Sequence, residues 1–131
     1  MKTIKKCLAF AIMAIVVTNF NNNIIRAEAQ SETKQELKDY AAYVADFYKI
    51  DKKKFFEVAT CESQWNPKAD NPKSTAYSIF QFLTGSWKYF AQKYEDDKGV
   101  TLNRNVPTDN IRLAGWVFAN DRPEQHWKEC W

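Results

Sequence analysis

The sequence predicts a small domain of mainly α structure, α+β at most, built from several short helices. Apolar residues recur at three- and four-residue spacing along most of the chain, which is the spacing of one helix face. Pro67 and Pro72 interrupt this pattern, and only residues 74–82 have an extended, aromatic-rich character. We therefore expect at most one short β-hairpin, within the single domain that 131 residues allow.

The N-terminal segment has the features of a secretory signal peptide. A lysine-rich start is followed by an almost unbroken apolar run at residues 7–17, and Ala27 and Ala29 occupy the two positions that a signal peptidase reads. A membrane anchor is the alternative, but the run is well short of the roughly 20 residues that span a bilayer. We expect residues 1–29 to be a signal peptide and residues 30–131 to be the domain.

The first two helices are expected on either side of residue 50. Asp51 is a good N-cap for the second helix, because its carboxylate can accept a hydrogen bond from the first turn. That helix must end after Ser63, since Pro67 cannot continue it. The apolar positions of the two helices are Leu37, Tyr40, Ala41, Val44 and Tyr48 in the first, and Phe55, Val58 and Ala59 in the second.

Further helices are expected in the second half of the chain. Helical spacing restarts over residues 87–94, and a polar loop around Gly99 follows over residues 95–107. Thr108 or Asp109 can cap the next helix, which carries apolar residues up to position 118. Pro123 suits the first turn of a last short helix that ends near the C-terminus.

Charge and histidine content exclude several classes of function. The formal net charge of +3 is accounted for by the lysines and Arg26 of the signal segment, so the remaining chain is close to neutral. It lacks the basic field that nucleic acids or anionic membranes attract, so we expect neither a nucleic-acid partner nor stable membrane insertion after signal cleavage. His126 is the only histidine, and no Cys/His cluster has metal-ligand spacing, so we expect no metal.

Two cysteines remain once the signal segment and its Cys7 are removed. An even pair in an exported protein indicates a disulfide between Cys61 and Cys130, although two unpaired buried thiols are the alternative. The bridge would close a long loop, which the chain-entropy model values at roughly 4 kcal/mol. It would also tie the end of the chain to the residue beside Glu62.

Glu62 is the candidate catalytic residue. It follows Val58 by one helical turn and Phe55 by two, so it lies on the apolar face of its helix. Loss of hydration there raises the pKa of a carboxyl group. A carboxylic acid still protonated near neutral pH is what cleavage of a glycosidic bond requires. The alternative is a helix-terminal glutamate that is exposed or paired with a lysine.

Several short motifs stand in series with Glu62. They are Glu62-Ser63, Asn66-Pro67 with Ala69, Ala76-Tyr77, Phe80-Gln81, Asp109-Asn110-Ile111 with Ala114, and the ending HWKECW. In this order they resemble the motifs of the soluble lytic transglycosylase, or goose-type lysozyme-like, family. The resemblance spans roughly residues 37–131, and ordered motifs in series are far more specific than any one alone.

The resemblance implies a lysozyme-like fold and a transglycosylase SLT domain that cleaves peptidoglycan without a cofactor. In that family the glutamate matching Glu62 is the single acid/base. It protonates the oxygen between N-acetylmuramic acid and N-acetylglucosamine, and the product carries a 1,6-anhydro ring. Two alternatives are a lysozyme-type enzyme that hydrolyses the same bond with water, and an inactive relative that binds glycan or a protein partner.

The resemblance also implies substrate contacts. Gln81 would line the cleft, Tyr77 and Trp65 would stack on sugar faces, and Ser63 would orient Glu62. The alternatives are a glutamine that satisfies loop backbone, aromatic residues that belong to the core, and a serine that caps its helix. One departure is Ser78, which stands where the family has glycine and could narrow the site or shift the loop.

The partners expected from this family are the glycan strands of peptidoglycan. Small members often open the wall for a secretion or conjugation apparatus. We expect a monomer, secreted through its signal peptide to the periplasm or the cell exterior and acting at the bacterial cell wall.

Overall fold

A computed structural model describes residues 32–131 of this chain. The predicted signal peptide, residues 1–29, lies outside the described residues. The chain divides into two units, Met1–Thr33 and Lys34–Trp131, and the described helices belong to the second. A search of the described residues found no helix with the length and apolar character needed to cross a membrane.

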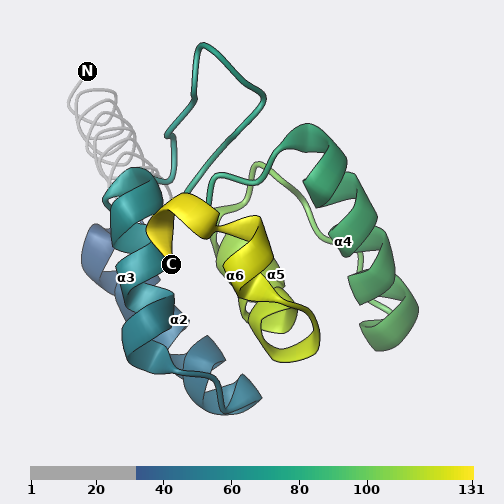
Figure 1. The fold of residues 1–131 in the computed structure, drawn as a ribbon. Helices are drawn as coiled ribbons and strands as arrows, with labels where there is room; N and C mark the ends of the chain where they lie inside the picture. Colours follow the sequence, from purple (N-terminus) through teal and green to yellow (C-terminus); the bar gives the residue numbers. More distant parts are fainter. Residues whose placement is uncertain (1–31) are drawn as a thin grey trace, which may run out of the picture. The chain divides into compact units, whose positions relative to one another are not determined.

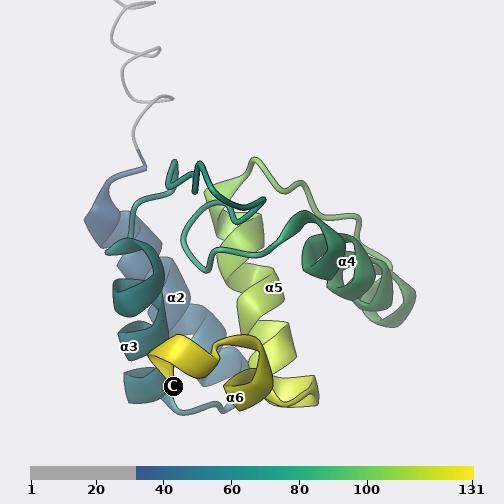
Figure 2. The same ribbon diagram turned by 45° about the horizontal axis from the view of Figure 1, so that its top comes forward.

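The structure confirms the prediction of a mainly α fold. α5 lies between α2 and α4, and the C-terminal segment packs beside α3 (Figures 1 and 2). The helices are α2 (Lys34–Tyr48), α3 (Lys52–Ser63), α4 (Thr84–Lys98), α5 (Pro107–Asn120), α6 (Pro123–His126) and the 3₁₀ helix η1 (Lys128–Cys130).

The contact between α2 and α5 depends on a small residue. Gly115 of α5 faces α2 so closely that a Cβ atom built on it would lie 2.2 Å from Cγ1 of Val44 and 3.2 Å from the ring of Tyr48. Glycine is therefore needed here for the approach of one helix to another, and not for its backbone freedom. This contact fixes the axis of α5, which carries several of the core residues.

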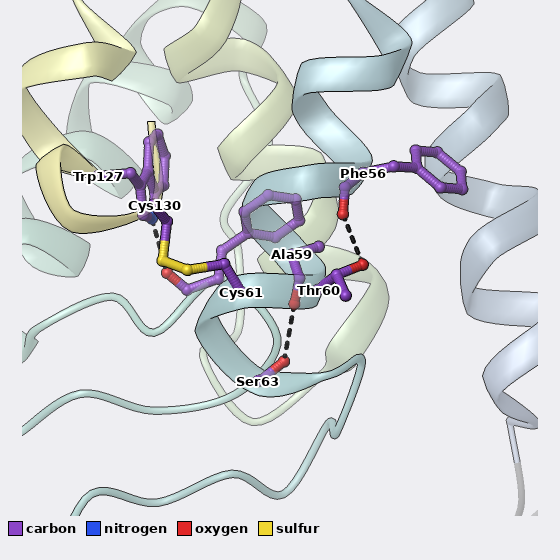
Figure 3. The surroundings of a disulfide bond; sticks show 8 residues. Phe56, Ala59, Thr60, Cys61, Ser63, Trp127 and Cys130 are labelled. Atoms are coloured by element: carbon purple, nitrogen blue, oxygen red, sulfur yellow. Dashed lines mark hydrogen bonds between the residues drawn. A yellow bond between two sulfur atoms is a disulfide. The ribbon is translucent and has the colours of Figure 1, made fainter.

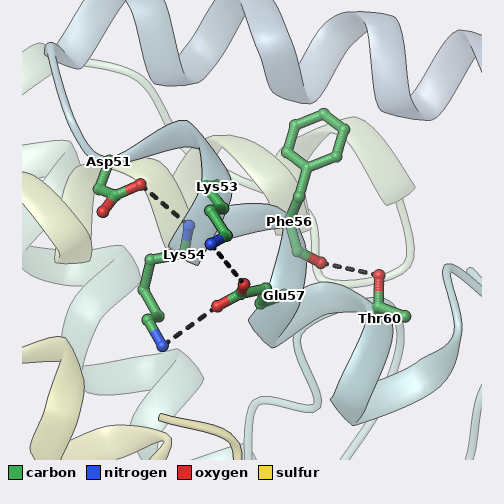
Figure 4. A network of polar contacts seen from close by, with 6 residues as sticks. All are labelled: Asp51, Lys53, Lys54, Phe56, Glu57 and Thr60. Carbon is green, nitrogen blue, oxygen red and sulfur yellow. Dashed lines mark hydrogen bonds and ion pairs between the residues drawn. The ribbon is translucent and has the colours of Figure 1, made fainter.

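α3 begins and ends as its sequence indicates. The side chain of Asp51 accepts a hydrogen bond from the backbone N–H of Lys54 at 3.0 Å, which confirms the predicted N-cap. On the exposed side, Glu57 pairs with Lys54 at 3.2 Å and with Lys53 at 3.9 Å (Figure 4). At the far end, Gln64 adopts the left-handed conformation, and its N–H bonds to Thr60 O.

Two predicted helix boundaries were wrong. α4 continues through the acidic residues assigned to a loop, because Gly99 ends it at φ 68° with its N–H bonded to Glu95 O at 2.8 Å. α5 begins at Pro107, which suits a first turn because it lacks the N–H that would remain unpaired. Neither Thr108 nor Asp109 caps this helix. Asp109 instead accepts a hydrogen bond from Asn103 N–H at 2.9 Å.

The segment between α3 and α4, residues 66–83, is termed here the motif loop. The expected hairpin is reduced to two isolated antiparallel bridges, Asp70 with Tyr77 and Tyr77 with Phe82, and no strand forms within residues 32–131. The prolines and the left-handed residues Ser78 and Gln81 prevent longer pairing.

Aromatic side chains from four segments form the core beneath the motif loop. Phe80 of the loop stacks on Phe55 of α3, with ring centroids 4.7 Å apart, and also contacts Phe118 of α5. Trp127 packs against Phe80 and Phe82 from the C-terminal segment. The apolar half of the motif loop is thus anchored in the core of the domain.

Candidate active site

Glu62 occupies the last turn of α3, directly before the chain turns into the motif loop. Its side chain is half-buried, and desolvation raises the pKa of its carboxyl above the usual 4.5. Among the described residues, no hydrogen bond or ion pair to its carboxylate is found. Burial without a cation to compensate is the condition that favours the protonated form.

Glu57 on the same helix shows the opposite environment. It is exposed and held by two lysines, Lys53 and Lys54, as an ordinary surface ion pair. The two glutamates differ because Glu57 faces solvent, whereas Glu62 continues the row of Phe55 and Val58, which are fully buried. The environment of Glu62 agrees with the sequence-based expectation. Its catalytic role stays a prediction.

The first motif, Glu62-Ser63 with Asn66-Pro67 and Ala69, and the second motif, Ala76-Tyr77 with Phe80-Gln81, meet at one backbone carbonyl. Ala69 O accepts the N–H of Ser78 at 2.8 Å and the side-chain amide of Gln81 at 3.0 Å. The same amide donates to Ser78 O at 2.7 Å. Gln81 therefore ties the two sides of the motif loop together. This was the alternative role considered for it, that of satisfying loop backbone.

The third motif, Asp109-Asn110-Ile111 with Ala114, joins the second through a buried amide. Asn110 of α5 is fully buried, and its Oδ1 accepts the backbone N–H of Phe80 at 2.9 Å. On the other side of the same residue, Phe80 O accepts the indole N–H of Trp127 at 2.9 Å. Both backbone groups of Phe80 are thus held by side chains that come from distant parts of the chain.

Ser78 keeps the backbone conformation for which glycine is suited. Its φ is +67°, in the left-handed region that side chains disfavour, and its hydroxyl is buried without a hydrogen-bond partner among the described residues. At this position the loop therefore has the backbone geometry that glycine adopts most readily. The serine side chain points into the protein, since it is only 1% exposed, so it does not narrow an open cleft.

The other predicted substrate contacts divide into two groups. Tyr77 is half-buried in the motif loop, beneath the guanidinium of Arg104. Gln81 lines a small hollow of about 60 Å³ together with Leu83 and Ser86. Although the amide nitrogen of Gln81 is committed to backbone carbonyls, no described residue bonds to its side-chain oxygen, so that oxygen can accept a hydrogen bond from a ligand. Tyr77 and Gln81 remain candidates.

Trp65 and Ser63 make contacts within the protein, and their predicted roles toward substrate stay predictions. Trp65 is only 2% exposed, packs on Phe56 and donates its indole N–H to Thr60, so its ring offers no open face to a sugar. Ser63 bonds back to Ala59 O at 3.4 Å within α3. No hydrogen bond between its hydroxyl and Glu62 is found among the described residues, and the C-cap position of α3 is taken by Gln64.

The residue next to Glu62 is covalently fixed. Cys61 is joined to Cys130 by a disulfide that brings η1 against the last turn of α3 (Figure 3). Cys130 N–H also bonds to Trp127 O, so the bridge and the buried indole belong to one short segment. The end of α3 is thereby tied to the same C-terminal segment that contacts the motif loop through Trp127.

Sequence reasoning assigned no role to three residues that hold the motif loop: Arg104, which lies outside the motifs, and Asn110 and Trp127, which lie within them. Asn110 gave a signal, because it is a polar residue on an otherwise apolar helix face. Trp127 and Arg104 act from far along the chain on backbone atoms, which no local pattern reveals. A search of residues 32–131 found no cluster of acidic, histidine or cysteine side chains able to hold a metal ion.

A small helical domain of this architecture falls in the lysozyme-like class. A family model described as Transglycosylase SLT domain matches residues 39–125, and the chain belongs to that family. Its members are generally lytic transglycosylases, which act on the peptidoglycan of the cell wall. A search of curated proteins gave no match to the chain.

Proposed function

We propose that the protein is a peptidoglycan lytic transglycosylase in which Glu62 is the single acid/base. The observation that carries the proposal is the half-buried, unpaired carboxyl of Glu62 at the end of α3, with its raised pKa. Family membership supports the substrate class. The convergence of the three motifs on the loop that follows Glu62 supports a preformed site.

The reaction needs a proton donor and then a base at the same position. Protonated Glu62 gives its proton to the oxygen between N-acetylmuramic acid and N-acetylglucosamine as the bond from that oxygen to C1 breaks. The Glu62 carboxylate then removes the proton of the muramyl 6-hydroxyl, whose oxygen forms the new bond to C1. Glu62 ends protonated as it began, no water is consumed, and the product is a 1,6-anhydro sugar.

Glu62 is suited to this double role because it is desolvated but not tied to a cation. A fixed ion pair would hold the carboxylate charged and remove its proton-donating capacity. Asp70, the next acidic residue along the chain, lies exposed in the motif loop and its backbone is bridged to Tyr77. The proposal therefore assigns no role to a second carboxylate.

The test is mass spectrometry of the fragments that the protein releases from purified peptidoglycan. Wild-type protein should release fragments lighter by one water than their hydrolytic counterparts, and Glu62→Gln should release none. Glu57→Gln is the matched control, because it removes a carboxylate from the exposed side of the same helix. Reducing-end products would instead make the protein a lysozyme-type hydrolase. Activity that survives Glu62→Gln would overturn the assignment.

The pH dependence of cleavage gives a second test. The first step needs protonated Glu62, so kcat/KM should fall as the pH rises through the pKa of this group. Because burial raises that pKa above 4.5, the fall should begin at a higher pH than for an ordinary glutamate. A descending limb centred at or below 4.5 would contradict the proposal.

Secretion and assembly are also proposals. We infer that residues 1–29 direct export and that the protein acts as a monomer in the periplasm or outside the cell. Local opening of the wall for a secretion or conjugation apparatus is the role that fits a small enzyme of this family. Mass analysis of the exported protein, which should begin at Gln30, tests the proposed signal cleavage.

A further inference from the structure

We propose that Arg104 is a positioning residue that fixes the motif loop for substrate binding. The inference rests on the proposed function and deepens it, because it names a residue outside the sequence motifs on which the site depends. Arg104 lies in the connection between α4 and α5, far along the chain from the loop that it contacts.

The guanidinium of Arg104 binds both ends of the second half of the motif loop. One terminal nitrogen, Nη2, donates to Phe82 O at 2.8 Å and also to Thr75 O. The other, Nη1, donates to the hydroxyl of Thr84 at 2.9 Å, where α4 begins. A single planar group thus links residue 75 to residues 82 and 84, and the stretch between them contains Tyr77 and Gln81.

The same group also fixes the position of the tyrosine ring. The central carbon of the Arg104 guanidinium lies 5.6 Å from the ring centroid of Tyr77, within the range of a cation–π contact. Tyr77 has no other described ring contact, so Arg104 sets the orientation of the one half-buried aromatic side chain in this stretch. Loss of Arg104 therefore affects both the loop backbone and this candidate sugar-stacking ring.

The chemistry requires arginine and not simply a positive charge. The rigid, planar guanidinium contacts three hydrogen-bond acceptors and one aromatic face at once. The ammonium group of a lysine cannot contact all four from one position. The Nε of Arg104 is buried without a partner among the described residues. A buried donor without a partner opposes folding. The hydrogen bonds that hold this side chain in place are therefore those of its two terminal nitrogens.

Arg104 is predicted to act on binding and not on proton transfer. Glu62 lies on α3, and desolvation alone raises its pKa, with no contribution from Arg104. Substitution of Arg104 should therefore raise KM and leave the pH at which kcat/KM declines unchanged. A residue needed only for global stability would lower activity in proportion to the folded fraction and leave KM unaltered.

The experiment compares Arg104→Gln and Arg104→Lys with two arginine controls. Arg112→Gln removes an arginine that donates to Tyr40 between α2 and α5 and pairs with Asp109 at 3.9 Å, and neither of these partners belongs to the motif loop. Arg122→Gln removes an exposed one. With soluble peptidoglycan fragments, Arg104→Gln should raise KM about tenfold, the effect of losing a charge-assisted hydrogen bond. Arg104→Lys should recover only part of this loss, and both controls should keep the wild-type KM.

Hydrogen exchange supplies a readout that does not depend on activity. The amides of Tyr77 and Ser78, bonded to Phe82 O and Ala69 O, should exchange about tenfold faster in Arg104→Gln and at the wild-type rate in Arg112→Gln. Unchanged exchange, or a KM no higher than in the controls, would overturn the proposal for Arg104. If wild-type protein cleaves nothing, the proposed function fails, and the exchange rates still decide whether Arg104 fixes the loop.

Discussion

Burial of Glu62 favours the protonated carboxyl that the proposed reaction needs, and it opposes folding at neutral pH. A carboxyl whose pKa is higher in the folded state than in the unfolded state binds protons more tightly when folded. Its contribution to stability is therefore fully present below the ordinary value of 4.5 and is lost as the pH rises through the folded pKa. At neutral pH the folded state must either keep Glu62 protonated or carry its charge with little hydration. Both cost free energy relative to the unfolded chain, in which this carboxylate is hydrated and ionised.

Glu62→Gln should consequently be more stable than wild type at pH 7 and equal to it in acid. Glutamine is neutral at every pH, so it removes only the cost of the buried charge. Thermal unfolding from pH 3 to pH 8 measures the difference. Glu57→Gln, which loses an exposed ion pair, should show no such gain. A Glu62→Gln protein less stable than wild type at pH 7 would show that desolvation does not dominate at this site.

Ser78 is a second residue at which local geometry opposes stability. A left-handed backbone costs roughly 1 kcal/mol or more for a residue with a side chain, and the buried hydroxyl adds an unpaired polar group. We expect Ser78→Gly to stabilise the protein by about 1 kcal/mol, even after the extra chain entropy of glycine. Urea unfolding checks this. Ser86→Gly, inside α4, should instead destabilise the protein by a similar amount.

At the scale of helices, the approach of α5 to α2 depends on Gly115. Alanine there would gain roughly 1 kcal/mol of helix propensity. The added methyl group would, however, overlap Cγ1 of Val44, and overpacking of a core contact costs typically 1–3 kcal/mol or more. We expect Gly115→Ala to lower the free energy of unfolding.

Gly85 is the matched control for this substitution. It lies in the first turn of α4, and a Cβ atom built on it meets nothing within 4 Å. Gly85→Ala should therefore be neutral or stabilising by up to about 1 kcal/mol. Equal effects of the two alanines in urea unfolding would show that α2 and α5 do not pack as closely as described.

At the scale of the whole molecule, the disulfide links α3 to the end of the chain. The bridged cysteines are 69 positions apart, and the chain-entropy model values a loop of that size at roughly 4 kcal/mol. Replacement of Cys61 and Cys130 together by serine should lower the free energy of unfolding by about that amount. Chemical unfolding of oxidised wild type and the double variant measures it. A loss below about 1 kcal/mol would mean that the packing of Trp127 alone holds the segment.

The helices and the candidate acid could be predicted because each follows from neighbours in sequence. Helical periodicity predicted α2 and α3, and Asp51 predicted the N-cap of α3. The row of apolar residues on α3 predicted that Glu62 lies on the buried face of that helix. The end of α4 escaped prediction because Gly99, and not the acidic residues before it, ends the helix, and the start of α5 escaped because it has no side-chain cap. The roles of Arg104 and Trp127 escaped because they depend on backbone atoms brought near by the fold.

The last residues of the domain complete the support of the motif loop, and this sets an order of assembly. Trp127 and Cys130 come after the segments that they contact, namely the motif loop and α3. Because a chain is synthesised from its N-terminus, these two residues are added after those segments. Until they emerge, Phe80 O lacks its indole donor and α3 lacks its covalent tie. The motif loop and the end of α3 therefore gain these two supports only when residues 127–130 have joined the rest of the fold.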